Sequence, residues 1–186
     1  MVVDHGVAVL SKIFLAAFVV AVAIYDVRER RIPNFLVFPA VAAGLVLNGV
    51  RGWSGIGFSL AGILAGLGLL LVPYLFRVMG AGDVKFLGAI GAFVGSWGAV
   101  RVILIGLLVY PLIAIFFVIA QGKLKLTVVR FLRLLSRFLA GIIPALREID
   151  NRLLKYDEPE STSASTPFGL SIAIGVLLAL GTQFLA

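Results

Sequence analysis

The chain has 186 residues, of which 61% are apolar and 13% are charged, and its mean hydropathy is +1.14. Because an average soluble domain is about half apolar and about a quarter charged, this composition excludes a water-soluble globule. The chain contains no cysteine and one histidine, His5, which excludes disulfides and thiol catalysis and argues against a metal site or a catalytic triad. We therefore expect an all-α integral membrane protein without a metal ion or a cofactor.

Six apolar stretches are predicted to cross the membrane, since a span needs about 20 mostly apolar residues. In chain order they are residues 6–25, 34–50, 56–78, 84–98, 99–120 and 168–186. The first stretch is expected to be a retained helix rather than a signal peptide, because an acidic residue precedes it and basic residues follow it. Residues 1–186 are expected to form one membrane domain.

The distribution of basic residues predicts the orientation of this domain. With the N-terminus outside, all of the 16 Lys and Arg residues except Lys12, Arg51 and Arg101 lie on the inner side. The inner loops of membrane proteins carry such an excess of positive charge. Six helices then place both termini outside, in a multi-pass protein of the cell membrane.

Residues 121–166 are predicted to form an amphipathic helical segment in the cytoplasmic interface rather than a seventh span. Arg130, Arg133 and Arg137 follow helical spacing there, and Phe and Leu residues between them supply an apolar face. We expect these basic side chains to bind anionic lipid and not nucleic acid.

Two aspartates at the inner membrane face are the candidate catalytic residues. Asp26 ends the first predicted helix in YDVRERRIPN, and Asp83 begins the fourth in GAGDVKFLGAIG. Acidic groups at this depth are costly and are commonly functional. If two carboxyl groups share one proton, the ionised group can take a proton from water while the protonated group polarises a peptide carbonyl. Alternatively, Asp26 pairs with Arg30 and Asp83 with Lys85 in ion pairs that only anchor the chain.

Glycines surround this pair of aspartates in the sequence. Gly80 and Gly82 suit a backbone that bends tightly, or approaches a substrate closely, just before Asp83. Other glycines recur at helical spacing and predict close helix packing around the pair. These are Gly62, Gly66, Gly88, Gly91 and Gly95.

The segment DVRERRIPN, followed by GAGDVK, resembles the type IV prepilin peptidases, which are six-helix aspartic proteases of the GxGD class. The likeness runs from about Asp26 to Gly95 and returns at TPFGLSIAIG, and it is strongest to the short bacterial forms that serve Flp/Tad-type or related pili. It implies that Asp26 and Asp83 are the catalytic pair and that prepilins or pseudopilins are cleaved at the cytoplasmic face. It also implies an active-site loop that contains Gly80, Gly82, Lys85, Pro33 and Asn34.

The chain departs from the longer members of that family, because it has no cysteine-bearing cytoplasmic segment. N-methyltransferase activity and the zinc tied to that segment are therefore not expected. The substrate leader of that family is basic, and residues 28–31 include three arginines that would repel it. We expect these arginines to bind anionic lipid and Glu29 to contact the leader; alternatively, Glu29 only pairs with a neighbouring arginine.

Two other classes of protein are alternatives. Tyr25-Asp26, GAGD and Pro144-Ala145-Leu146 match the motifs of presenilin-like intramembrane proteases in order, but those proteins carry the first aspartate on a late helix. A non-enzymatic membrane protein, such as an assembly scaffold, is the other alternative. A transporter would show repeated halves, and none is visible. The sequence does not predict the oligomeric state.

Overall fold

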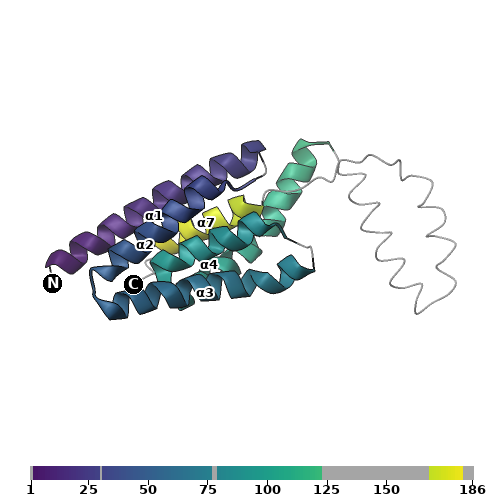
Figure 1. The fold of residues 1–186 in the computed structure, drawn as a ribbon. Helices are drawn as coiled ribbons and strands as arrows, with labels where there is room; N and C mark the ends of the chain where they lie inside the picture. The colour runs from purple at the N-terminus through teal and green to yellow at the C-terminus, as the bar shows by residue number, and fades with distance from the viewer. Residues whose placement is uncertain (1, 30, 77–78, 123–167, 182–186) are drawn as a thin grey trace. The chain divides into compact units, whose positions relative to one another are not determined.

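The computed structural model describes residues 2–29, 31–76, 79–122 and 168–181, and every regular element among them is an α-helix (Figure 1). The helices are α1 (Val2–Glu29), α2 (Asn34–Gly49), α3 (Trp53–Leu75), α4 (Ala81–Ala120) and α7 (Phe168–Gly181). The all-helical fold agrees with the sequence prediction. The interfacial segment predicted over 121–166 lies outside the described residues, apart from 121 and 122.

The chain divides into two compact units. Met1–Pro111 and Pro167–Ala186 form the first unit, and Leu112–Thr166 form the second. In the second unit the structure describes residues 112–122, which are the last residues of α4 and the turn that follows them. Everything that concerns the candidate site belongs to the first unit.

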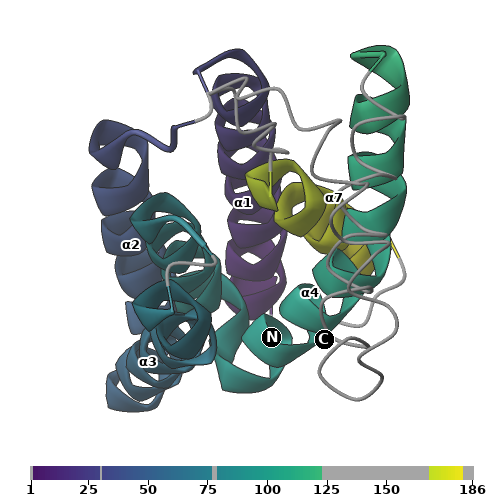
Figure 2. The ribbon, with the colours of Figure 1, turned by 90° about the vertical axis from the view of Figure 1, so that its right-hand side faces the viewer.

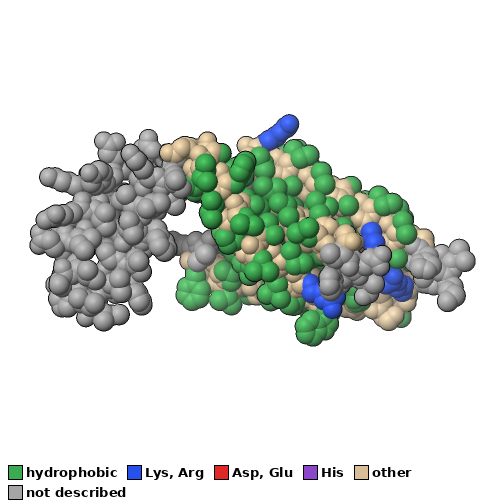
Figure 3. All heavy atoms as spheres, turned by 180° about the vertical axis from the view of Figure 1, so that it is seen from behind, with side chains coloured by type: hydrophobic (Ala, Val, Ile, Leu, Met, Phe, Trp, Pro, Cys, Tyr) green, Lys and Arg blue, Asp and Glu red, His purple; other side chains and the backbone are tan. Residues whose placement is uncertain are grey.

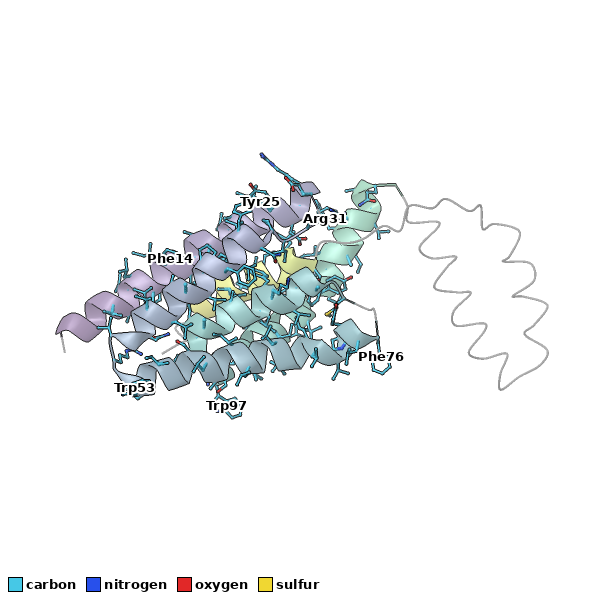
Figure 4. All side chains as sticks on the ribbon, in the orientation of Figure 1. Phe14, Tyr25, Arg31, Trp53, Phe76 and Trp97 are labelled. Atoms are coloured by element: carbon cyan, nitrogen blue, oxygen red, sulfur yellow. The ribbon has the colours of Figure 1, made fainter. Side chains whose placement is uncertain are left out.

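Among the described residues, three helices are long and apolar enough to cross a bilayer, namely α1 from Gly6 onward, α3 and α4. The apolar helices α2 and α7 are shorter in the described residues. The outer surface carries many large apolar side chains, and Figure 3 shows one such face with only a few Lys and Arg side chains. Trp53 and Trp97, which are 88% and 76% exposed, project away from the helices (Figure 4). These features indicate a multi-pass membrane protein.

The helix ends differ from the predicted limits of the membrane spans. α1 continues past residue 25 to Glu29, so Asp26 lies inside its last turn, and α3 begins and ends three residues before the predicted 56–78. The predicted break between residues 98 and 99 instead lies at Gly95, which divides α4 into residues 81–94 and 96–120. Gly95 has a φ of 71°, a conformation that a residue without a Cβ adopts at little cost.

Side chains from two neighbouring helices compensate for the break in α4. A helix leaves the carbonyl groups of its last turn without intrahelical partners, and Ala92 lies in the last turn before Gly95. The buried Asn48 amide donates to the Ala92 carbonyl at 2.9 Å, and the Ser59 hydroxyl donates to the same oxygen at 2.7 Å. Asn48 also donates to Ser59 at 3.0 Å. The three residues therefore join α2, α3 and α4 through satisfied polar groups.

The predicted glycine packing is confirmed between α3 and α4. A Cβ on Gly62 would meet the Gly91 carbonyl group, and a Cβ on Gly66 would lie 2.5 Å from the Leu87 carbonyl oxygen. The backbones of the two helices are therefore in direct contact, as in other membrane helix pairs with small residues at the interface.

The first segment of α4 lies at the centre of the first unit. Phe86, Leu87 and Ile90 are fully buried there, and the Phe86 ring packs edge-on against Phe18 of α1. α7 lies beside α1 (Figure 2). This arrangement places the last turn of α1, the first turn of α4 and the first turn of α7 at one end of the unit, where the candidate site lies.

Candidate active site

Asp26 is buried in the last turn of α1, where its side chain is 5% exposed. Its Oδ2 atom accepts a hydrogen bond of 2.9 Å from the backbone N–H of Leu170, and the N–H of Gly169 interacts with the same carboxyl group. Both donors belong to the first turn of α7, whose N–H groups have no partner within the helix. The positive end of the α7 dipole therefore faces the Asp26 carboxyl group and favours a negative charge on it.

Asp83 is the third residue of α4 and is half-buried. Its carboxyl group accepts a hydrogen bond from the Gly80 backbone and lies close enough to Asp26 for the two groups to interact electrostatically. The structure therefore brings together two carboxyl groups from α1 and α4 that are 57 positions apart in the sequence.

The residues that were predicted to form the active-site loop lie at the start of α2 and at the start of α4. Pro33 precedes α2 in an extended conformation, and Asn34 begins the helix. The Lys85 ammonium group donates to the Asn34 side-chain oxygen at 3.2 Å, which ties α4 to the start of α2. Lys85 therefore has a hydrogen-bond partner other than Asp83. An anchoring ion pair with Asp83, the alternative considered from the sequence, is not the only interaction that this lysine can make.

Ile32 lies between the elements that carry the two aspartates. A Cβ on Gly82 would be 3.2 Å from the Ile32 Cβ, and a Cβ on Gly169 would be 3.2 Å from the Ile32 Cδ1. The Ile32 side chain thus fills the space between the first turn of α4 and the first turn of α7. Gly82 allows the loop before α2 to approach α4.

The basic and acidic residues after Asp26 are exposed. Arg28 and Glu29 end α1, and Arg31 follows at the start of the loop to α2; all three side chains are exposed (Figure 4 labels Arg31). Arg30 lies outside the described residues. Glu29 is therefore accessible at the same end of the unit as the two aspartates.

Three contributors to the site were missed by the sequence analysis. The Leu170 N–H and Gly169 lie against the Asp26 carboxyl group, and Ile32 lies against Gly82 and Gly169. A Cβ on Gly169 would lie 2.8 Å from the Asp26 Oδ2 atom, so glycine is required there for the close approach. The resemblance at TPFGLSIAIG pointed to the start of the last helix, and this was the available signal for Gly169.

The described residues contain no group of three or more His, Asp or Glu side chains that could hold a metal ion. The chemistry that they can support is acid–base chemistry by two neighbouring carboxyl groups. Such a pair can deprotonate a water molecule and protonate a carbonyl oxygen without a metal ion.

Several characterised proteins are similar to this chain, and each is named a prepilin leader peptidase/N-methyltransferase. The protein of Aeromonas hydrophila is 30% identical over 112 residues, which cover 56% of this chain and 38% of the relative. The protein of Xanthomonas campestris is 32% identical over 128 residues, which cover 65% of this chain and 45% of the relative. The protein of Klebsiella pneumoniae is 32% identical over 101 residues, or 50% of this chain and 44% of the relative.

The chain thus spans less than half the length of these relatives. No solved structure is significantly similar to it. The model of the type IV leader peptidase family matches residues 13–145, a range that includes both aspartates, the glycines before Asp83 and the loop that contains Pro33 and Asn34. On this match, the chain belongs to the type IV leader peptidase family.

Proposed function

We propose that this protein is a membrane-embedded aspartic endopeptidase that removes the short basic leader from prepilins or pseudopilins at the cytoplasmic membrane face. The proposal is supported above all by one observation: the carboxyl groups of Asp26 and Asp83 interact electrostatically at one end of the helical unit. Membership of the type IV leader peptidase family supports the substrate class. It also favours this function over the presenilin-like and non-enzymatic alternatives.

The surroundings of the two aspartates suggest a division of roles. Asp26 faces the N–H groups at the start of α7, which favour its ionised form, so it acts as the base that takes a proton from water. Asp83 then holds the shared proton and donates it to the carbonyl oxygen of the scissile bond as the water oxygen attacks the carbonyl carbon. When the tetrahedral intermediate collapses, the proton on Asp26 passes to the leaving nitrogen, the C–N bond breaks, and Asp83 recovers its proton from the intermediate.

The proposed topology has six spans with both termini outside. The break at Gly95 supports separate fourth and fifth spans, because a residue with positive φ interrupts the helix. The exposed Arg28, Arg31 and Lys85 at the aspartate end support a cytoplasmic location for that end. The basic residues, including those predicted in the interfacial segment, bind anionic lipid and set the depth of the site.

The proposal covers the peptidase activity alone. This chain holds no cysteine, and the resemblance links N-methylation to a cysteine-bearing segment.

Cleavage of a prepilin tests the proposed function directly. The protein is co-expressed with a candidate prepilin, and the loss of the leader is followed as a size shift on a gel. Cleavage is expected to continue in EDTA and in serine and cysteine protease inhibitors, since the proposed mechanism uses neither a metal ion nor a covalent nucleophile. Inactivation by EDTA that added metal reverses, or no cleavage of any prepilin encoded nearby, would contradict the proposal.

Replacing Gly169 with alanine is expected to slow cleavage at least tenfold, because misplacing a reacting group by about 1 Å has effects of that size or larger. The new methyl group would lie 2.8 Å from the Asp26 Oδ2 atom and would displace the carboxyl group from the α7 N–H groups. The change should lower kcat and leave KM almost unaltered. Gly181→Ala, at a position in α7 with no atom within 4 Å, is the matched control and should cleave normally. Equal rates for the two variants would remove Gly169 from the site.

We also propose that the exposed Glu29 attracts the basic leader. Glu29→Gln should slow cleavage of a leader that contains several lysines by about twofold to fivefold, as expected for an exposed charge pair. A substrate whose leader lysines are replaced by glutamine should be cleaved by the variant and the wild type at the same rate. If the variant slows both substrates equally, Glu29 has no role in leader recognition.

A further inference from the structure

An apolar groove of about 390 Å³ runs between α1 and α7. Val19, Ala23 and Val27 contribute to its α1 side, and Ala173 and Leu177 contribute to its α7 side. The residues that line it are all apolar except Arg28 at one end. Two of the lining residues, Ala23 and Ala173, have small side chains, and they lie on facing helices.

One end of this groove reaches the candidate active site. Leu170, whose N–H group binds the Asp26 carboxyl group, is a lining residue, and Val27 and Arg28 directly follow Asp26 in α1. From Val27 the groove extends along α1 to Val19, eight residues away. At about 1.5 Å per residue this is about 12 Å, or a little more than two helical turns. The groove therefore leads from the residues next to Asp26 into the part of α1 that is apolar enough to cross the membrane.

We propose that this groove binds the apolar helix of the substrate over the residues that directly follow the scissile bond. The proposal rests on the proposed function, in which the substrate has a basic leader before the cut and an apolar helix after it. A substrate whose scissile carbonyl is held by Asp26 and Asp83 must continue into the bilayer, and the groove offers a concave apolar path that begins at Leu170 and Arg28, next to Asp26.

Charge at the mouth of the groove determines which part of the substrate enters it. Arg28 is exposed there and repels the basic leader, whereas apolar side chains gain free energy by leaving water or a loosely packed lipid surface for the groove. The leader is thereby kept out of the groove. The groove would then discriminate between substrates by the size of the side chains in the first two turns after the cut.

Filling the groove with a large side chain tests this assignment. Val20 lines the groove, is 45% exposed and lies six residues from Asp26, so Val20→Trp fills the groove without touching the aspartates. Ile13→Trp is the matched control, because Ile13 is an exposed apolar residue of the same helix that does not line the groove. Each full-length variant is assayed on a prepilin with its whole apolar helix and on a short peptide that ends directly after the scissile bond.

Val20→Trp is expected to raise KM for the helix-bearing substrate about tenfold, the effect of losing the burial of about one apolar side chain, with kcat nearly unchanged. The short peptide should be cleaved equally by the wild type, Val20→Trp and Ile13→Trp. An unchanged KM for the helix-bearing substrate, or equal losses on both substrates, would overturn the groove assignment.

A crosslinking experiment separates the failure of this inference from the failure of the proposed function. A photoreactive side chain is placed at position 20 or at position 13 of the full chain in membranes that contain the prepilin. Capture of the prepilin's apolar helix from position 20 but not from position 13 supports the groove even if the wild type cleaves nothing. Capture of lipid alone from both positions overturns it even if the wild type cleaves the prepilin normally.

Discussion

Asp26→Asn and Asp83→Asn are each expected to reduce prepilin cleavage at least a thousandfold while the protein still folds and inserts into the membrane. An asparagine amide can neither take a proton from water nor donate one to a carbonyl oxygen, so each change removes one half of the acid–base pair. A thousandfold loss corresponds to about 4 kcal/mol of the activation free energy. The measurement is the fraction of prepilin that loses its leader during co-expression.

The two variants should fold because asparagine is nearly isosteric with aspartate. In Asp26→Asn, the side-chain oxygen can still accept the hydrogen bond from the Leu170 N–H. Equal membrane levels and equal unfolding temperatures in detergent provide the control. Substantial cleavage by either variant at normal expression would show that the corresponding aspartate is not required for the reaction.

Gly62→Ala is expected to lower the free energy of unfolding by about 3 kcal/mol, near the upper end of the usual cost of overpacking a core. The added Cβ would overlap the carbonyl group of Gly91, which belongs to the backbone of α4 and cannot rotate away. The two helices would have to separate, and this movement would also disturb the nearby contact between Gly66 and the Leu87 carbonyl. Thermal unfolding of the detergent-solubilised protein measures the loss.

Two other glycines of α3 supply the matched controls for this experiment. A Cβ on Gly57 or on Gly68 would meet no atom within 4 Å. Gly57→Ala and Gly68→Ala should therefore unfold at the wild-type temperature or slightly above it, since alanine favours a helix by up to about 1 kcal/mol over glycine. If Gly62→Ala unfolded at the same temperature as these controls, the backbones of α3 and α4 would not be in direct contact at Gly62.

Local patterns in the sequence predicted the helical fold and close helix packing at the glycines, but not which two helices meet there. The apolar stretches identified the helices, and Gly62 and Gly91 were found because glycines at helical spacing lie on one face. The predicted position of the break in α4 was three residues late, because Gly95 and Gly98 both suit a break and only packing distinguishes them. Gly95 is the residue that has positive φ, beside the Ala92 carbonyl that Asn48 and Ser59 satisfy.

The aspartates could be selected from the sequence because acidic groups are rare beside apolar spans. Their surroundings could not be derived in the same way. The Leu170 N–H is a backbone group, and no side-chain pattern identifies it as the partner of Asp26. Ile32 is one apolar residue among many, and its position between Gly82 and Gly169 follows from how the loop before α2 lies against two helix ends.

The hydrogen bond between Asp26 and the Leu170 N–H also has a consequence for the newly synthesised chain. The two residues are 144 positions apart, and chains grow at about 5–20 residues per second, so about 7–30 s separate the synthesis of one partner from that of the other. During that interval α1 can enter the membrane, but the Asp26 carboxyl group has no α7 to bind. A ribosome-bound chain that stops before α7 contains both aspartates, yet it lacks the N–H groups that hold Asp26 in place.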